Sequence, residues 1–102
     1  MPGAQVHVVG APIVAAVQRL YLALLGQFAD SHIVRIHGEP VAHIVMTAAQ
    51  AWQAQARLGR ELDADPEFAA WDTALKLQRI NPGTTADLTV ATLLVAGLTT
   101  PP

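Results

Sequence analysis

Apolar residues recur at helical spacing in three long segments of the chain. They fall three or four positions apart in residues 12–29, 41–57 and 66–79. This spacing is typical of amphipathic α-helices, and no segment shows the alternation of a half-buried strand. We therefore expect three long helices. The apolar stripe of the first helix consists of Ile13, Val17, Leu20, Tyr21, Leu24, Leu25 and Phe28.

Helix-start signals agree with this periodicity. Asp65 is a favourable N-cap, and Pro66 fits a first helical turn, where the amide hydrogen that proline lacks is not needed. Asp30 and Ser31 are N-caps of the same kind, so we expect a short helical turn over residues 32–37.

The last apolar stretch has no polar face. From residue 88 to residue 98, only Thr89 and Thr92 interrupt the apolar side chains. Thr84 suits the N-cap of this stretch, and Asp87 is placed to complete a capping box. Because a helix that is apolar all round is normally buried, we expect a buried C-terminal helix. The predicted fold class is all-α, a small helical bundle of four main helices plus a short helical turn.

The composition is apolar for so short a chain. Of 102 residues, 52% are hydrophobic and 14% are charged, whereas roughly a quarter are charged in an average domain. Such a chain forms a single domain with too little polar surface to cover itself. We therefore expect a second copy of the chain, or a missing N-terminal half, to cover one apolar face. Residues 1–10 show no consistent period and are expected to be irregular.

The charge and cysteine content argue against several partners and site types. The net charge is −2 without a cluster of Lys or Arg, so we expect neither nucleic acid nor membrane as a partner. The chain has no cysteine and therefore no disulfide framework, which is compatible with a cytoplasmic protein. Gln18 and Arg19 interrupt the longest apolar run, so we expect no membrane span.

Residues 30–39 gather polar side chains at an expected helix start. One interpretation is an anion or nucleotide site, in which Arg35 forks onto a phosphate, His32 or His37 donates to it, and a carboxylate binds Mg²⁺ or acts as a base. The other is an N-cap followed by solvent-facing residues. The two histidines are five positions apart and do not share a helical face, so we do not expect zinc. The carboxylates are those of Asp30 and Glu39.

Residues 81–87 form a second polar segment, with the sequence Asn-Pro-Gly-Thr-Thr-Ala-Asp. Pro82 and Gly83 are turn residues, and Gly83 permits a positive φ. Free amides at a helix start, a glycine and two hydroxyls suit a phosphate, to which Asp87 would bind through Mg²⁺. The alternative is that these groups only cap the following helix.

Both polar segments resemble the C-terminal part of triphosphoribosyl-dephospho-CoA synthases. The resemblance lies in residues 30–39 and 80–91, is supported by residues 62–76, and covers residues 11–98 overall. The family is all-α and makes the prosthetic-group precursor of malonate decarboxylase and citrate lyase. Its members transfer the triphosphoribosyl group of ATP to a ribose hydroxyl of dephospho-CoA and release adenine.

The resemblance implies roles for individual residues, with ATP and dephospho-CoA as substrates and Mg²⁺ as the cofactor. Asp87 would be the metal ligand and, with Glu39 and His37, a catalytic residue. The remaining residues would bind substrate, namely Ser31, His32, Arg35, Asn81, Gly83, Thr84 and Thr85.

The chain also departs from the family. The family's N-terminal motifs are absent, and Ile36 stands where members usually carry a basic residue. The resemblance therefore implies a truncated homologue or a fragment that is inactive alone, and it leaves open whether this chain is an enzyme. The alternative function is a non-catalytic helical module that forms oligomers or docks on a partner.

Overall fold

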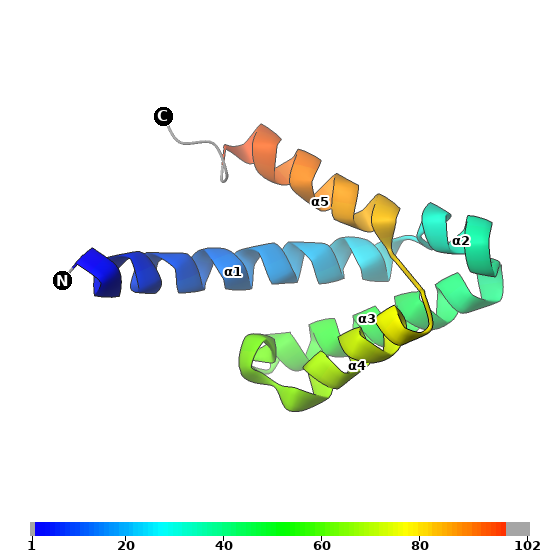
Figure 1. Ribbon diagram of the computed structural model, residues 1–102, viewed down its shortest axis with the longest axis horizontal. Helices are drawn as coiled ribbons and strands as arrows, with labels where there is room; N and C mark the ends of the chain where they lie inside the picture. Colours follow the sequence, from blue (N-terminus) through cyan, green and yellow to red (C-terminus); the bar gives the residue numbers. More distant parts are fainter. Residues whose placement is uncertain (1, 98–102) are drawn as a thin grey trace.

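The described part of the chain is a bundle of five α-helices and one short 3₁₀ helix. The computed structural model describes the backbone of residues 2–97 and the side chains of residues 13–97. The elements are α1 (Pro2–Gln27), α2 (Ser31–His37), α3 (Glu39–Arg57), η1 (Leu62–Ala64), α4 (Pro66–Leu77) and α5 (Gly83–Ala96). Figure 1 shows α1 between α5 on one side and the α3–α4 pair on the other. The described residues contain no strand, which confirms the all-α prediction.

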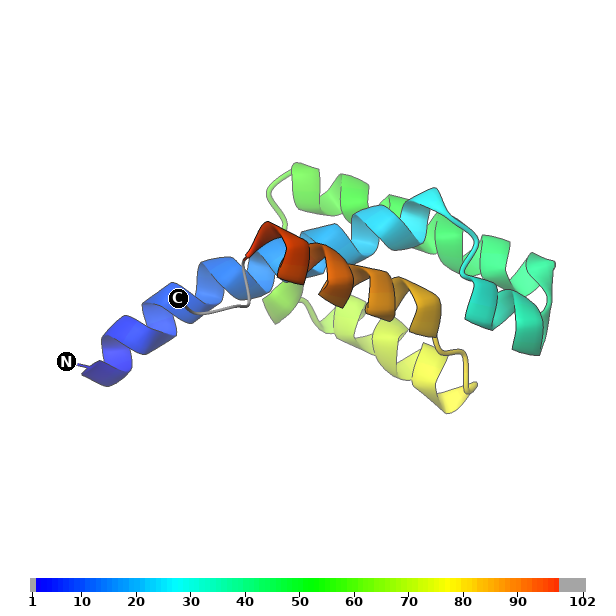
Figure 2. The same cartoon turned by 90° about the horizontal axis from the view of Figure 1, so that it is seen from above.

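The first helix is longer than the sequence predicted. It begins at Pro2, so the expectation of an irregular segment over residues 1–10 is wrong for the residues described. A helix that is already formed gains hydrogen bonds as it is extended, without a new nucleation step, although Pro12 has no amide hydrogen to donate. In α1 this gain outweighs the missing bond at Pro12 and the weak helix propensity of Gly3 and Gly10. The start of α1 extends beyond the other helices in Figure 1 and Figure 2.

Gly38 separates α2 from α3. Its φ of 92° lies in a region that side chains rarely adopt, and its amide donates to the carbonyl of Val34 at 2.9 Å. Pro40 then occupies the first turn of α3, where no amide hydrogen is needed. The predicted short turn after Asp30 is therefore confirmed.

The core lies between α1 and α3, with contributions from α2, η1 and α4. The two long helices approach closely at Gly26, whose carbonyl accepts a hydrogen bond from Gln50 Nε2 at 2.8 Å. A β-carbon at Gly26 would lie 3.1 Å from Gln50 Cγ, so the missing side chain permits this approach. The buried core residues are Leu22, Leu25, Ile33, Ala42, Val45, Ala49, Leu62, Leu75 and Ile80.

Three aromatic side chains join α3 to α4. The ring centroid of Trp52 lies 5.3 Å from that of Phe68 and 6.3 Å from that of Trp71. The first pair meets edge to face, which is a favoured geometry for aromatic rings. All three side chains pack against the core and extend it toward the end of α3.

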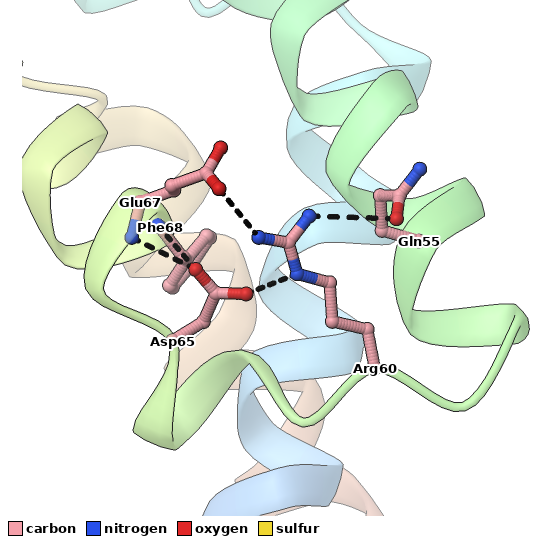
Figure 3. A network of polar contacts seen from close by, with 5 residues as sticks. All are labelled: Gln55, Arg60, Asp65, Glu67 and Phe68. Carbon is pink, nitrogen blue, oxygen red and sulfur yellow. Dashed lines mark hydrogen bonds and ion pairs between the residues drawn. The ribbon is translucent and has the colours of Figure 1, made fainter.

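Arg60 and Asp65 form a polar network at the turn between α3 and α4. Figure 3 shows the guanidinium of Arg60 between the carboxylates of Asp65 and Glu67 and the side chain of Gln55. Asp65 Oδ1 also accepts the amides of Glu67 and Phe68, at 2.8 and 3.1 Å. The predicted N-cap role of Asp65 is therefore confirmed.

The last helix is not the buried rod that its sequence predicted. Only three of its residues are buried, because α5 packs against α1 and the start of α2 while no other described helix covers its opposite side. Residue 98, predicted to belong to this helix, lies outside the described residues. Across residues 2–97, no helix combines the length and apolar character that a membrane crossing requires. The exposed fractions of Leu88, Val90, Leu94 and Val95 are 44%, 56%, 55% and 91%.

Candidate functional site

Asp30 connects the starts of two helices. It precedes α2 and is only 2% exposed. Its Oδ1 accepts hydrogen bonds from the amides of His32 and Ile33, at 2.9 and 3.1 Å. Its Oδ2 accepts hydrogen bonds from the amide and the hydroxyl of Thr85, at 2.7 and 2.6 Å. One buried carboxylate thus caps α2 and holds the first turn of α5 beside it. These four bonds occupy both oxygens, which favours the capping role of Asp30 over that of a base or metal ligand.

This contact joins the two polar segments of the sequence into one region. Ser31 Oγ lies 2.6 Å from Thr84 Oγ1. A β-carbon on Gly83 would lie 3.5 Å from His32 Cγ and 3.6 Å from Asn81 Nδ2, so these residues are neighbours. We call this group the α2–α5 junction. It contains six of the seven predicted substrate-binding residues, Ser31, His32, Asn81, Gly83, Thr84 and Thr85.

The first turn of α5 differs from the predicted phosphate cradle. The helix begins at Gly83 without a side-chain cap from the residue before it, so Thr84 is not the N-cap. The φ of Gly83 is not positive either. The Gly83 amide donates to the Asn81 carbonyl at 2.8 Å, and the Thr85 amide donates to Asp30. Since these amides are occupied and a carboxylate already lies at the helix start, anion binding here would depend on side chains.

Arg35 extends the α2–α5 junction along α2. It is exposed, and its Nη2 lies 3.1 Å from Nδ1 of His32. A guanidinium only donates hydrogen bonds, so in this arrangement His32 accepts at Nδ1 and carries its proton on Nε2. The region therefore brings together a guanidinium, an imidazole N–H and the hydroxyls of Ser31 and Thr84. The guanidinium, the imidazole N–H and one of the two hydroxyls can donate to an anionic ligand, because the other hydroxyl donates within the Ser31–Thr84 contact.

His37 and Glu39 lie at the other end of α2. His37 Nε2 donates to the carbonyl of Arg79 at 2.8 Å, which ties α2 to the segment before α5. Glu39 is exposed in the first turn of α3. Among the described residues, no hydrogen bond or ion pair joins either residue to Asp87. The three predicted catalytic residues therefore do not share a hydrogen-bond network.

Asp87 is exposed near the start of α5, three positions after Thr84. Side chains three positions apart are neighbours on a helix surface, so Asp87 and Thr84 lie on the same side of α5. Among the described side chains, those of residues 13–97, no group of three or more His, Cys, Asp or Glu could hold a metal ion. Mg²⁺ is commonly bound by one or two carboxylates together with substrate phosphates, and Asp87 suits that arrangement.

A cavity of about 370 Å³ opens beside the turn at Asn81 and Pro82. Two of its lining side chains, Lys76 and Arg79, are cationic. Lys76 Nζ pairs with a carboxylate oxygen of Asp72 at 2.7 Å. Arg79 takes part in no ion pair among the described residues. The cavity thus adds positive charge next to the α2–α5 junction.

Tyr21 separates this cavity from an apolar groove of about 470 Å³. Burial raises the pKa of Tyr21 to about 12, and the charges of Asp72 and Asp30 add to the effect. The phenol therefore stays protonated at neutral pH and can donate a hydrogen bond. The sequence pattern placed Tyr21 only in an apolar stripe, because spacing indicates its helix face but not the nearby carboxylates. The lining of this α1–α5 groove is Ile13, Val14, Val17, Gln18, Tyr21, Ala86 and Thr89.

The comparisons with known proteins agree with the resemblance in the two polar segments. Residues 4–101 match the family described as ATP:dephospho-CoA triphosphoribosyl transferase. No curated protein and no solved structure matches the chain. Because the family match spans nearly all of the 102 residues, the chain belongs to the ATP:dephospho-CoA triphosphoribosyl transferase family.

Proposed function

We propose that the α2–α5 junction binds the substrates of a triphosphoribosyl-dephospho-CoA synthase reaction. Family membership gives the reaction class, and one observation supports this location. The buried carboxylate of Asp30 unites the two family-like segments, which lie 55 positions apart at its contact with Thr85.

The reaction exchanges one bond at the ribose of ATP for another. The bond between C1′ and adenine breaks, and C1′ forms a bond to a ribose hydroxyl oxygen of dephospho-CoA. Adenine leaves with the bonding electron pair and takes up a proton at the released nitrogen, and a base takes the proton of the attacking hydroxyl. Such a reaction needs donors for the triphosphate, a carboxylate or imidazole base, and support for positive charge on the ribosyl group.

The residues divide between these tasks by their chemistry. Thr84 and Asn81 would bind the triphosphate end through their side chains, and Gly83, which has no side chain, would let the ligand approach closely. Asp87 would hold Mg²⁺, which offsets phosphate charge when bound. Arg35 and His32 would donate hydrogen bonds to dephospho-CoA. Thr85 would act through Asp30 rather than on substrate, because its hydroxyl is already bonded to that carboxylate. Glu39 and His37 would approach the hydroxyl of dephospho-CoA.

A further polypeptide surface would complete the site over the α1–α5 groove. The exposed apolar side chains of α5 support this, since a contiguous apolar patch usually marks a surface that binds another protein. The chain by itself would then bind substrate without turnover. This explains why the three predicted catalytic residues are not joined in the described structure.

Calorimetric titration with ATP and with dephospho-CoA, each with and without Mg²⁺, tests the proposal. We expect saturable heat, and a loss of affinity of about tenfold or more in Arg35→Gln, because a charge-assisted hydrogen bond is removed. Asp87→Asn should weaken only the titration of ATP with Mg²⁺. The control is Thr73→Ala, an exposed side chain on α4, which should bind as the parent chain does. Unchanged binding in both test variants would remove the assigned roles.

The alternative is a non-catalytic helical module that self-associates or docks on a partner through the α1–α5 groove. The same exposed face favours it. No heat with either substrate, together with a dimer by light scattering, would support this alternative. Val14→Glu should then dissociate the dimer, because Val14 lines the groove and is 47% exposed on the chain alone.

A further inference from the structure

A second polar region lies at the opposite end of α3 from the α2–α5 junction. Arg19 from α1 and Arg57 from the last turn of α3 line one cavity of about 300 Å³. Leu22 and Ala56 supply its apolar lining, and Gln53 supplies an amide. Figure 1 shows that α3 ends beside the middle of α1, far along the bundle from α2.

The two arginines share this cavity without an acidic partner. Among the described residues, the ion pairs involve only Arg60 and Lys76 as cations. No Asp or Glu lines the cavity. Two positive charges at one cavity repel each other, and an anion bound between them adds two attractions that offset this repulsion.

Acidic side chains border the adjoining cavity instead. Arg19 also lines a neighbouring cavity of about 370 Å³, together with Arg60, Glu61 and Asp63. Arg60 is already paired with Asp65 and Glu67, so it adds little free positive charge there. The adjoining cavity is therefore unfavourable for an anion, and the position between Arg19 and Arg57 is the favourable one.

We propose that Arg19, Arg57 and Gln53 form a binding site for an anion with two linked phosphate groups. A guanidinium forks onto two oxygens of one phosphate, so two guanidinium groups suit a diphosphate. The Gln53 side-chain amide would donate a further hydrogen bond, and buried Leu22 contributes apolar lining. The site shares no residue with the α2–α5 junction and does not depend on the function proposed for it.

Titration of the full chain with inorganic pyrophosphate, at low salt and without divalent metal, tests this site. We expect saturable heat that weakens as salt is added. Arg19→Gln and Arg57→Gln should each weaken binding by about tenfold or more, because each removes a forked, charge-assisted contact. Lys76→Gln removes one positive charge from α4 and should leave the affinity unchanged. An equal loss in all three variants would overturn the proposal, because it would show an unspecific effect of net charge.

Backbone amide resonances then locate the anion. We expect pyrophosphate to shift the resonances of Gln53 and Arg57 and to leave those of Gly83 and Thr84 unchanged. Shifts confined to the α2–α5 junction, or no heat at all, would overturn the proposal. Glu61→Gln removes a negative charge from the adjoining cavity and should tighten binding, whereas weaker binding would contradict the electrostatic basis. Thermal unfolding of each variant verifies that it remains folded.

Discussion

Two buried aspartates, Asp30 and Asp65, cap the starts of helices. Their second carboxylate oxygens accept hydrogen bonds from different kinds of partner. Asp30 and Asp65 each accept two helix-start amides at Oδ1. Oδ2 of Asp65 accepts from Arg60, five positions away, whereas Oδ2 of Asp30 accepts from Thr85, 55 positions away. No cation pairs with Asp30 among the described residues. Asp65 therefore stabilises one local corner, while Asp30 fixes the positions of two segments distant in sequence.

The difference matters for function because the candidate substrate-binding groups stand on those two segments. Ser31 follows Asp30 directly, and Thr84 precedes Thr85. The 2.6 Å contact between the Ser31 and Thr84 hydroxyls thus depends on a carboxylate that does not itself need to touch substrate. Asp30 is a positioning residue, and its loss should separate groups that its neighbours bring together.

Replacement of the two aspartates by alanine should give the largest difference in stability. Asp30→Ala removes the cap of α2 and leaves the buried amide and hydroxyl of Thr85 without an acceptor, so we expect a loss of about 2–4 kcal/mol. Asp65→Ala should lower the melting temperature less, because the groups it leaves are closer to water. Urea and thermal unfolding followed by circular dichroism measure both effects.

Asp30→Asn is the matched control for the first variant. Asparagine keeps one acceptor oxygen for the start of α2, but its NH₂ group cannot accept from Thr85. Its stability should lie between those of the parent chain and Asp30→Ala. If Asp65→Ala destabilised the chain more than Asp30→Ala, the structural role assigned to Asp30 would be wrong.

Two threonines on α5 provide the next test of the same contact. The Thr85 hydroxyl donates to the Asp30 carboxylate at 2.6 Å, whereas the Thr89 hydroxyl donates to the Thr85 carbonyl at 2.8 Å. We expect Thr85→Val to cost about 2 kcal/mol, because a buried hydrogen bond to a charged group is lost. Thr89→Val should cost less than about 1 kcal/mol, since that hydroxyl bonds only to a carbonyl of its own helix.

Chemical denaturation measures the stability of the two valine variants, in which the side-chain volume hardly changes. Both threonines are buried, and each substitution exchanges a hydroxyl for a methyl group. Equal losses would show that the charged acceptor on Asp30 adds nothing beyond an ordinary helix contact.

Local capping was predictable from the sequence. Asp65 caps amides two and three positions ahead of it, and the Asp30 contact with α2 has the same range. A glycine at position 38 and a proline at position 40 likewise act on their immediate neighbours. These signals need only the chain's own spacing, which is why the bounds of α2, α3 and α4 agree well with prediction.

Long-range contacts were not predictable from one sequence. The partner of Thr85 lies 55 positions away, so spacing indicated only that Thr84 or Asp87 would cap the last helix. The apolar character of α5 indicated burial, but burial requires a covering surface that the described helices do not provide. The same limit explains why the two polar segments were predicted separately and why Tyr21 was assigned only to packing.

Acid titration tests how the contacts of Asp65 lower its pKa and stabilise the fold. Burial alone would raise the pKa of Asp65, but the hydrogen bonds from Arg60 and from the amides of Phe68 and Glu67 more than offset it. Its pKa in the folded chain therefore lies below the ordinary value of 3.8. Because the unfolded chain has the higher pKa, this group stabilises the fold above pH 3.8, and the contribution is lost as the pH falls through the folded pKa.

Arg60→Gln should make the stability of the fold depend less on pH in the acid range. Without the guanidinium, burial is less fully offset and the folded pKa of Asp65 moves back toward its ordinary value. Melting temperatures measured at a series of pH values below 3.8 should fall more steeply in the parent chain than in Arg60→Gln. Parallel curves would mean that the Arg60–Asp65 contact does not set the pKa.

Alkaline titration of Tyr21 tests the environment of Asp30, whose charge contributes to the raised pKa of Tyr21. This test has the smallest expected effect on stability at neutral pH. The chain has a single tyrosine, so the ultraviolet absorbance of tyrosinate reports this residue alone. We expect a midpoint near 12 rather than the ordinary 10.0. Since the folded pKa is the higher one, stability should fall as the pH rises from 10.0 toward 12.

Removal of each nearby carboxylate charge then shows how much that charge contributes to the raised pKa of Tyr21. Asp72→Asn should lower the midpoint more than Asp30→Asn, because Asp72 contributes more than Asp30, and burial should retain the largest share. The measurement is valid at each pH where circular dichroism shows the helices intact. A midpoint near 10.0 in the parent chain would mean that the Tyr21 hydroxyl is hydrated. Tyr21 would then not be shielded between the cavity at Asn81 and Pro82 and the α1–α5 groove, both of which it lines.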